Sequence, residues 1–173
     1  MKHVVVLPYS EKWHVKFIEE AENLKQIFKS EIIDIHHIGS TSVPGLKAKP
    51  IIDIMPVVRN INNVDKYNHQ MQQIGYEPKG ELGIKGRRYF RKGGDNRSHH
   101  VHIFQLGSDD IKRHLAFREY LRKHSEVRSS YGNLKENLAK QFPYDMELYI
   151  KGKESFVKDT ERKALKWYED YRE

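Results

Sequence analysis

The sequence predicts an α+β fold, in which a short mixed or antiparallel sheet is flanked by helices and followed by a helical C-terminal half. Apolar residues recur at helical spacing near the start of the chain, and β-branched apolar runs typical of buried strands follow them. After residue 108 the apolar residues return to near-helical spacing. The chain thus runs from a helix to strands with one inserted helix, and then to further helices. This order is typical of an α+β architecture.

The first predicted helix begins near Ser10, whose hydroxyl can cap it. Its apolar stripe comprises Trp13, Phe17, Ala21, Leu24 and Phe28. Two strands follow, "EIIDIHHI" and "IIDIMPVV", and a glycine-serine loop joins them. A second helix is predicted to begin at or near Asn63 and to end at Gly75.

The middle of the chain is predicted to form a meander. "RRYFRK" and "SHHVHIFQL" are strand candidates, and "GGDN" between them is a strong turn signal. Ser108 then caps a helical half, whose apolar stripes comprise Val127, Tyr131, Leu134, Leu138, Phe142, Val157, Ala164, Tyr168 and Tyr171. We expect one domain over residues 1–173, with a sheet-containing core over about 1–107 and a helical part over about 108–173 packed on it.

Composition narrows the class of protein. A chain of 173 residues and 20.6 kDa suffices for one ordinary core, and a formal charge of +7 favours an anionic partner. Cysteine is absent, so disulfides, thiolate zinc sites and cysteine nucleophiles are excluded, and any metal must be held by His, Asp or Glu. No apolar run has the length of a secretory core or a membrane span, so we expect a cytoplasmic protein without a membrane partner.

The loop "GSTSVPGLKAKP" has the composition of a phosphate-binding loop. Gly39 lets the backbone approach a phosphate closely, and Ser40, Thr41 and Ser42 offer hydroxyl and amide donors. Lys49 adds positive charge. We predict that these five residues bind phosphate, and the alternative is an ordinary connection rich in turn residues.

Asp53 lies within the apolar run from Ile51 to Val58, where an unpaired carboxylate would cost roughly several kcal/mol. An aspartate in a buried strand is either an anchor for a helix or loop, or a metal ligand, and we favour the ligand. Without metal its charge would be poorly compensated, so Asp53→Asn is expected to stabilise the metal-free protein slightly.

The segments "HIGSTSVPGLKAKPIIDI", "HHVHIF", "HLAFREYLRKH" and "YGNLKENLAK" resemble the GrpB family, a largely uncharacterised branch of the nucleotidyltransferase superfamily with its polymerase-beta-like fold. The resemblance runs over nearly the whole chain. It implies a nucleotidyltransferase-like core with nucleotide phosphates at the Gly-Ser motif. It also implies nucleotidyl transfer by paired carboxylates plus a third carboxylate on a later strand, which together hold two metal ions.

The carboxylate set of that superfamily is incomplete in this chain. Asp53 matches the first carboxylate and takes the catalytic position, but Met55 stands at the second, and a thioether is a poor ligand for a hard cation. His100 and His102 share one face of their strand, roughly 6–7 Å apart, and can replace the missing ligand. With Asp53 they would hold one divalent metal (Mg, Mn or Zn), although imidazoles suit Zn and Mn better than Mg. The alternative is a pair of partly exposed histidines hydrogen-bonded to neighbours.

Further basic residues offer phosphate contacts. Arg87, Arg88 and Arg91 precede the histidine strand, and alternation lets only one of Arg87 and Arg88 face the cleft. We assign phosphate binding to Arg88, and a solvated basic edge strand is the alternative. Arg118 and Arg122 can bind phosphates or pair with nearby glutamates, and we predict the pairing. We predict helix packing and no chemistry for "YGNLKENLAK".

Two functions from different classes stay open. The first is a metal-assisted nucleotidyltransferase-like enzyme acting on an unidentified small acceptor. The second is a catalytically inactive nucleotide- or coenzyme A-related binding module, which the single carboxylate favours. The resemblance supports this second function, since it implies family members fused to dephospho-coenzyme A kinase. Both functions imply a nucleotide or other phosphorylated small molecule as partner.

Net charge alone supports RNA binding, because no RNP, KH or zinc-knuckle motif occurs, so we do not expect a nucleic-acid partner. The sequence leaves the oligomeric state open.

Overall fold

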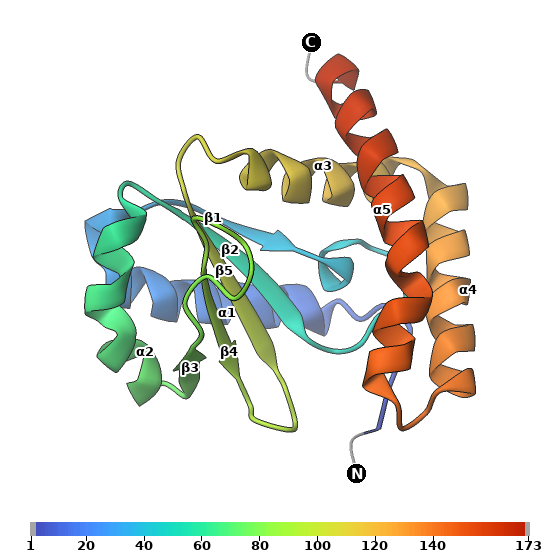
Figure 1. Ribbon diagram of the computed structural model, residues 1–173, viewed down its shortest axis with the longest axis horizontal. Helices are drawn as coiled ribbons and strands as arrows, with labels where there is room; N and C mark the ends of the chain where they lie inside the picture. Colours follow the sequence, from blue (N-terminus) through green and yellow to red (C-terminus); the bar gives the residue numbers. More distant parts are fainter. Residues whose placement is uncertain (1–2, 172–173) are drawn as a thin grey trace.

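A five-stranded mixed sheet organises the computed structural model, which describes residues 3–171 (Figure 1). Strand β1 (Ile32–Ile38) pairs antiparallel with β2 (Ile52–Val58), and β2 pairs parallel with β5 (His99–Gln105). The parallel pair therefore joins the strand that carries Asp53 to the strand that carries the two predicted histidine ligands.

Two shorter strands complete the sheet in the order β1-β2-β5-β4-β3. Strand β4 (Arg88–Lys92) pairs antiparallel with β5, and β3 (Tyr76–Pro78) pairs antiparallel with β4. The β4–β5 hairpin turns through the predicted "GGDN" segment. The expected short mixed sheet is confirmed.

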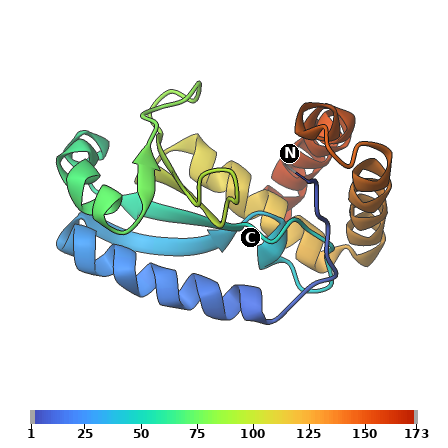
Figure 2. The ribbon, with the colours of Figure 1, turned by 90° about the horizontal axis from the view of Figure 1, so that it is seen from below.

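Helices cover both faces of the sheet (Figure 2). Helix α1 (Lys12–Phe28) packs its predicted apolar stripe on one face, and a short 3-10 helix, η1 (Lys29–Glu31), links it to β1. The N–H of Lys12 donates to the Ser10 hydroxyl, as the predicted cap requires. Helix α3 (Asp109–Lys123) covers the opposite face, and Ser108 caps it as predicted.

The second predicted helix is only partly an α-helix. It begins as a 3-10 helix, η3 (Ile61–Tyr67), and becomes α-helical as α2 (Asn68–Gln73). The Asn60 side chain accepts from the N–H of Asn62, and asparagines that bond locally to the backbone compete with regular helix geometry. Gly75 follows this helix with φ +95°, as predicted for a helix end.

The last two helices, α4 (Ser125–Gln141) and α5 (Met146–Tyr171), lie side by side beyond one end of the sheet (Figure 1). They approach closely where Gly152 faces Leu138, because a Cβ on Gly152 would lie 2.5 Å from Leu138 Cδ2. The predicted helical C-terminal half is confirmed. None of the helices within residues 3–171 combines the length and the apolar character that a membrane span requires.

Candidate functional site

Gly39 and Asp53 form one structural unit at the end of the sheet that faces α4 and α5. Gly39 follows β1 directly and adopts φ +72° and ψ −174°, which is essentially a glycine-only conformation. A Cβ on this residue would lie 2.6 Å from Asp53 Oδ2. The glycine of the loop therefore makes room for the carboxylate, since Asp53 lies opposite Ile38 in the β1–β2 register.

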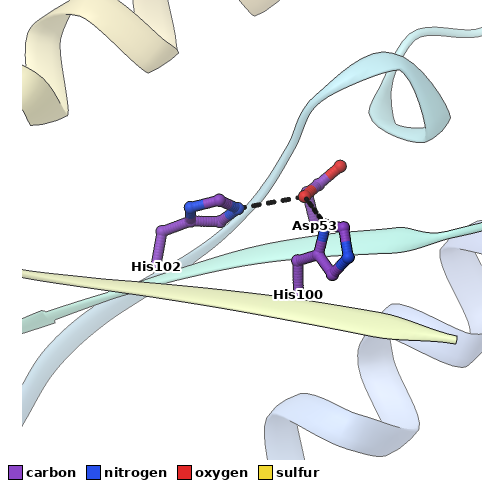
Figure 3. Close-up of side chains that lie close together, drawn as sticks. All are labelled: Asp53, His100 and His102. Carbon is purple, nitrogen blue, oxygen red and sulfur yellow. Dashed lines mark hydrogen bonds and ion pairs between the residues drawn. The ribbon is translucent and has the colours of Figure 1, made fainter. Parts of the chain in front are cut away.

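The side chains of Asp53, His100 and His102 point toward one another from the adjacent strands β2 and β5 (Figure 3). The Oδ1 atom of Asp53 is 3.0 Å from Nε2 of His102 and 3.4 Å from Nδ1 of His100. One ligand atom from each residue lies within 4.8 Å of the others. Since ligand atoms bind zinc at about 2.0–2.2 Å, this spacing fits a single divalent ion after small side-chain movements. Metal binding here stays a prediction.

The charge of Asp53 is compensated by protein groups. Burial alone would raise the pKa of this carboxyl group, but hydrogen bonds from His100 and His102 hold its pKa below the usual range. The folded protein therefore favours the ionised carboxylate. This contradicts the expectation that Asp53→Asn stabilises the metal-free protein, because that expectation assumed a poorly compensated charge.

Two arginines hold the outer ring nitrogens of these histidines. Arg87 Nη1 lies 3.4 Å from Nδ1 of His102, and Arg97 Nη1 lies 3.5 Å from Nε2 of His100. A guanidinium only donates, so these contacts favour the tautomers whose other N–H donates to Asp53. A metal bound at Nε2 of His102 would require the opposite tautomer and the loss of the Arg87 contact.

Arg88 does not take part in the site, and the prediction that it binds phosphate is wrong. Its Nε donates to Asp65 Oδ1 at 2.8 Å. In the β4–β5 register Arg88 lies opposite Ile103, and Tyr89 lies opposite His102. Arg88 therefore projects from the other face of the sheet, and the neighbouring Arg87 approaches the site instead.

The three hydroxyl residues of the loop, which form the 3-10 helix η2 (Ser40–Ser42), have different surroundings. The Thr41 hydroxyl donates to the carbonyl of Ile51, and the Ser42 hydroxyl donates to the carbonyl of Gly39. Both side chains are buried. Ser42 is thus used to hold the loop together, which contradicts its predicted phosphate contact, whereas Ser40 lines the cavities on both sides of Asp53.

Helix α3 anchors the same loop. The Arg122 guanidinium donates to the Ser42 carbonyl at 2.7 Å, and Arg118 donates to the His37 carbonyl at 3.1 Å. Both arginines also pair with Glu119, as predicted. Arg122 therefore holds the loop against the helix, and Arg118 holds the end of β1 there.

Met55, at the position of the second carboxylate, is fully buried and packs with Ile38 and Phe104 beneath α3. The face of β2 that carries Asp53 becomes apolar two residues later. A ligand at this position would lie inside the core rather than at the cavity.

Two cavities meet at Asp53. One, of about 280 Å³, lies toward α4 and α5, and the other, of about 210 Å³, lies between α3 and α5. Ser40, Asp53 and Lys153 line both of them, while His100 lines the first and His102 the second. The predicted phosphate ligand Lys49 lines the first cavity and places its Nζ 5.2 Å from the Tyr149 ring centroid.

Sequence reasoning missed two lysines of the first cavity, Lys135 on α4 and Lys153 on α5. Lys135 is only 2% exposed, and among residues 3–171 its Nζ has no hydrogen-bond partner. Burial, with the nearby charges of Lys153 and Lys49, lowers the pKa of Lys135 to about 6. The segment "YGNLKENLAK" thus packs through its apolar residues and also lines the cavity with Lys135. A signal was available, because Lys135 lies within an apolar stripe, four residues after Tyr131.

Residues 3–163 match the family model described as GrpB protein. The chain belongs to the GrpB family. It is 50% identical over 166 residues to the UPF0157 protein YqkA of Bacillus subtilis (strain 168). The aligned region covers 96% of this chain and 48% of YqkA. The chain thus spans about half the length of this relative. The crystal structure of the conserved protein GrpB from Enterococcus faecalis matches with a TM-score of 0.92 and 47% identity, covering 95% of this chain and 99% of that one.

More distant matches agree with the predicted fold. Cid1 in complex with the UTP analog UMPNPP matches with a TM-score of 0.51 and 15% identity, over 77% of this chain and 42% of that chain. Cid1 is described as a poly(U) polymerase. A dephospho-CoA kinase of Mycobacterium leprae (strain TN) is 24% identical over 172 residues, covering 83% of this chain and 42% of the kinase. The nucleotidyltransferase-like fold is therefore confirmed, and these similarities leave activity open.

Proposed function

We propose that this chain binds a nucleotide or another phosphorylated small molecule together with one divalent metal, and transfers a nucleotidyl group to a small acceptor. The position of Asp53, His100 and His102 at the junction of two cavities carries this proposal. A transfer reaction needs space for a donor and an acceptor on two sides of one reacting centre. The two cavities supply that space.

The residues have separable roles in this proposal. Asp53, His100 and His102 hold the metal, and Ser40 with the backbone of its loop binds a donor phosphate. A bound metal would supply Lewis-acid polarisation of a phosphoryl oxygen. In the transfer a bond forms between the acceptor's hydroxyl oxygen and phosphorus, the bond from phosphorus to the pyrophosphate oxygen breaks, pyrophosphate leaves, and the hydroxyl proton passes to water.

His102 must change its protonation pattern to serve as a ligand. In the metal-free site its Nε2–H donates to Asp53 and its Nδ1 accepts from Arg87. A ligating Nε2 carries no proton, so the ring proton moves to Nδ1 and the Arg87 contact is lost. Arg87 keeps its bonds to the carbonyls of Glu81 and Leu82, so its loop stays held.

A second candidate function is a binding module without transfer activity. The buried Met55 favours it, because two-metal catalysis requires a second carboxylate ligand that this position cannot offer.

Both functions predict that nucleoside triphosphates or coenzyme A raise the melting temperature. A ligand at about 100 times its dissociation constant stabilises the fold by roughly 2.7 kcal/mol, which corresponds to roughly 5–10 °C for a chain of this size. Binding without pyrophosphate release across a panel of small acceptors would select the inactive module.

Titration calorimetry with Mn²⁺ and Zn²⁺ tests the metal site. We expect Asp53→Asn to abolish binding, and His100→Ala and His102→Ala each to weaken it by roughly tenfold or more. Because a ligating imidazole must be neutral, affinity should also decrease in acid. His69→Ala, an exposed histidine on α2, serves as the matched control and should bind metal like the wild type. If all variants bind alike, or the wild type does not bind, the metal proposal fails.

A further inference from the structure

Three lysines from separate elements line the cavity that faces α4 and α5. Lys49 comes from the segment before β2, Lys135 from α4 and Lys153 from α5. Among the described residues that line this cavity, Asp53 is the one carboxylate, and His100 and His102 already donate to it. The cavity is therefore rich in amines and poor in matching acceptors.

Two buried polar groups of this cavity lack partners among residues 3–171. Lys135 Nζ and the Tyr149 hydroxyl are both buried without a hydrogen-bond partner in the described part of the chain. The lysines meet aromatic rings instead, with Lys135 Nζ 4.4 Å from the Tyr131 ring centroid and Lys153 Nζ 5.3 Å from that of Tyr149. Unpaired buried donors cost free energy, so such an arrangement favours a ligand that supplies acceptors.

We infer that this cavity is a polyphosphate subsite, in which Lys135 and Lys153 bind the oxygens of a di- or triphosphate directly and without metal. A polyphosphate offers several negative oxygens to amines that repel one another. The volume of about 280 Å³ lies at the lower limit of small-molecule sites and suits a phosphate chain rather than a whole nucleotide. This subsite is part of the proposed function, and the inference that its polyphosphate belongs to a nucleotide rests on that function.

Binding at this subsite should take up a proton. Burial and the facing ammonium groups of Lys153 and Lys49 lower the pKa of Lys135 to about 6, while the charge of Asp53 opposes this shift. The phenol groups of Tyr131 and Tyr149 face the same region and stay neutral, because burial raises their pKa. A bound polyanion stabilises the ammonium form of Lys135, so its affinity should decrease as the pH rises from 6 to 9.

Calorimetric titration with inorganic tripolyphosphate in the presence of EDTA tests the subsite in the full chain. We expect Lys135→Met and Lys153→Met each to weaken binding by roughly ten- to a hundredfold, the effect of one buried charge-assisted contact. Lys140→Met on α4 and Lys151→Met on α5 are exposed controls on the same helices and should bind like the wild type. Equal affinity of the wild type and both buried-lysine variants would overturn the inference.

A chemical probe keeps the test independent of variant folding. Pyridoxal phosphate forms an imine with an uncharged amine and releases water, and borohydride reduces that imine to a stable amine. We expect labelling of wild-type Lys135 that tripolyphosphate prevents, and labelling that tripolyphosphate leaves unchanged would overturn the subsite.

Asp53→Asn separates the two proposals. It should abolish metal binding and keep tripolyphosphate binding, because the subsite needs no metal. Metal-dependent nucleotide binding that is insensitive to Lys135→Met would retain the proposed function and refute the subsite. Loss of tripolyphosphate binding in Asp53→Asn would also refute it.

Discussion

The two sides of the cleft at Asp53 satisfy their polar groups very differently. On the sheet side, Asp53 accepts from His100 and His102, and each histidine is held by an arginine. On the helix side, Lys135 Nζ and the Tyr149 hydroxyl are buried without a hydrogen-bond partner within residues 3–171. The polar groups of the sheet side therefore satisfy one another without a ligand, whereas the helix side lowers stability until a ligand completes it.

Gly39→Ala should have the largest effect, because the added methyl group would clash with Asp53 on the sheet side. Its Cβ would lie 2.6 Å from Asp53 Oδ2 in a backbone conformation that only glycine adopts readily. We expect the free energy of unfolding to fall by roughly 3–5 kcal/mol and metal binding to be lost. Urea unfolding and Mn²⁺ calorimetry measure the two effects.

Gly80→Ala is the matched control for backbone conformation. Gly80 also has a positive φ, of +61°, but nothing lies within 4 Å of the position that an added methyl group would take. It should therefore lose only roughly 1–2 kcal/mol. Equal losses at Gly39 and Gly80 would mean that the contact with Asp53 contributes nothing.

On the helix side we expect the opposite effect on stability: Lys135→Met should stabilise the protein, whereas Gly39→Ala destabilises it. The pKa of Lys135 is about 6 in the folded protein against 10.5 ordinarily, so between these values the unfolded chain binds an extra proton. Wild-type stability therefore rises with pH across this window. We expect the variant to gain roughly 1–3 kcal/mol at pH 7, and the gain should shrink toward pH 10. Urea unfolding at pH 7 and 9.5 measures it.

Lys140→Met, on the exposed face of the same helix, should change stability by less than about 0.5 kcal/mol at either pH. A Lys135→Met variant that is less stable than the wild type at both pH values would contradict the contrast between the two sides. It would mean that Lys135 has a stabilising partner in the folded protein.

The sheet side could be predicted from sequence because strand alternation is regular. A period of two placed His100 and His102 on one face, and the apolar run around Asp53 indicated a buried strand next to them. The face of the sheet from which Arg88 projects could not be predicted in this way. It depends on the cross-strand pairing of Tyr89 with His102, which no local pattern encodes.

The helix side was missed for a different reason. Lysines on helices are normally exposed, so sequence reasoning passes over Lys135 and Lys153. Both continue apolar stripes, four residues after Tyr131 and Tyr149 respectively. That spacing indicates an inward direction, but the cavity into which they point exists only once α4 and α5 pack beyond the sheet. Tertiary packing therefore decides the chemistry of this side.

The smallest effects are expected at two neighbouring arginines, Arg87 just before β4 and Arg88 at its first residue. Arg88→Met removes a surface pair with Asp65, so stability should fall by at most about 1 kcal/mol and Mn²⁺ affinity should stay within about twofold. Arg87→Met removes a donor that holds His102 in the tautomer unsuited to metal binding. We therefore expect this variant to bind Mn²⁺ roughly threefold to tenfold more tightly. Weaker Mn²⁺ binding by Arg87→Met in calorimetry, at unchanged stability, would show that Arg87 supports the ligating form of His102 instead.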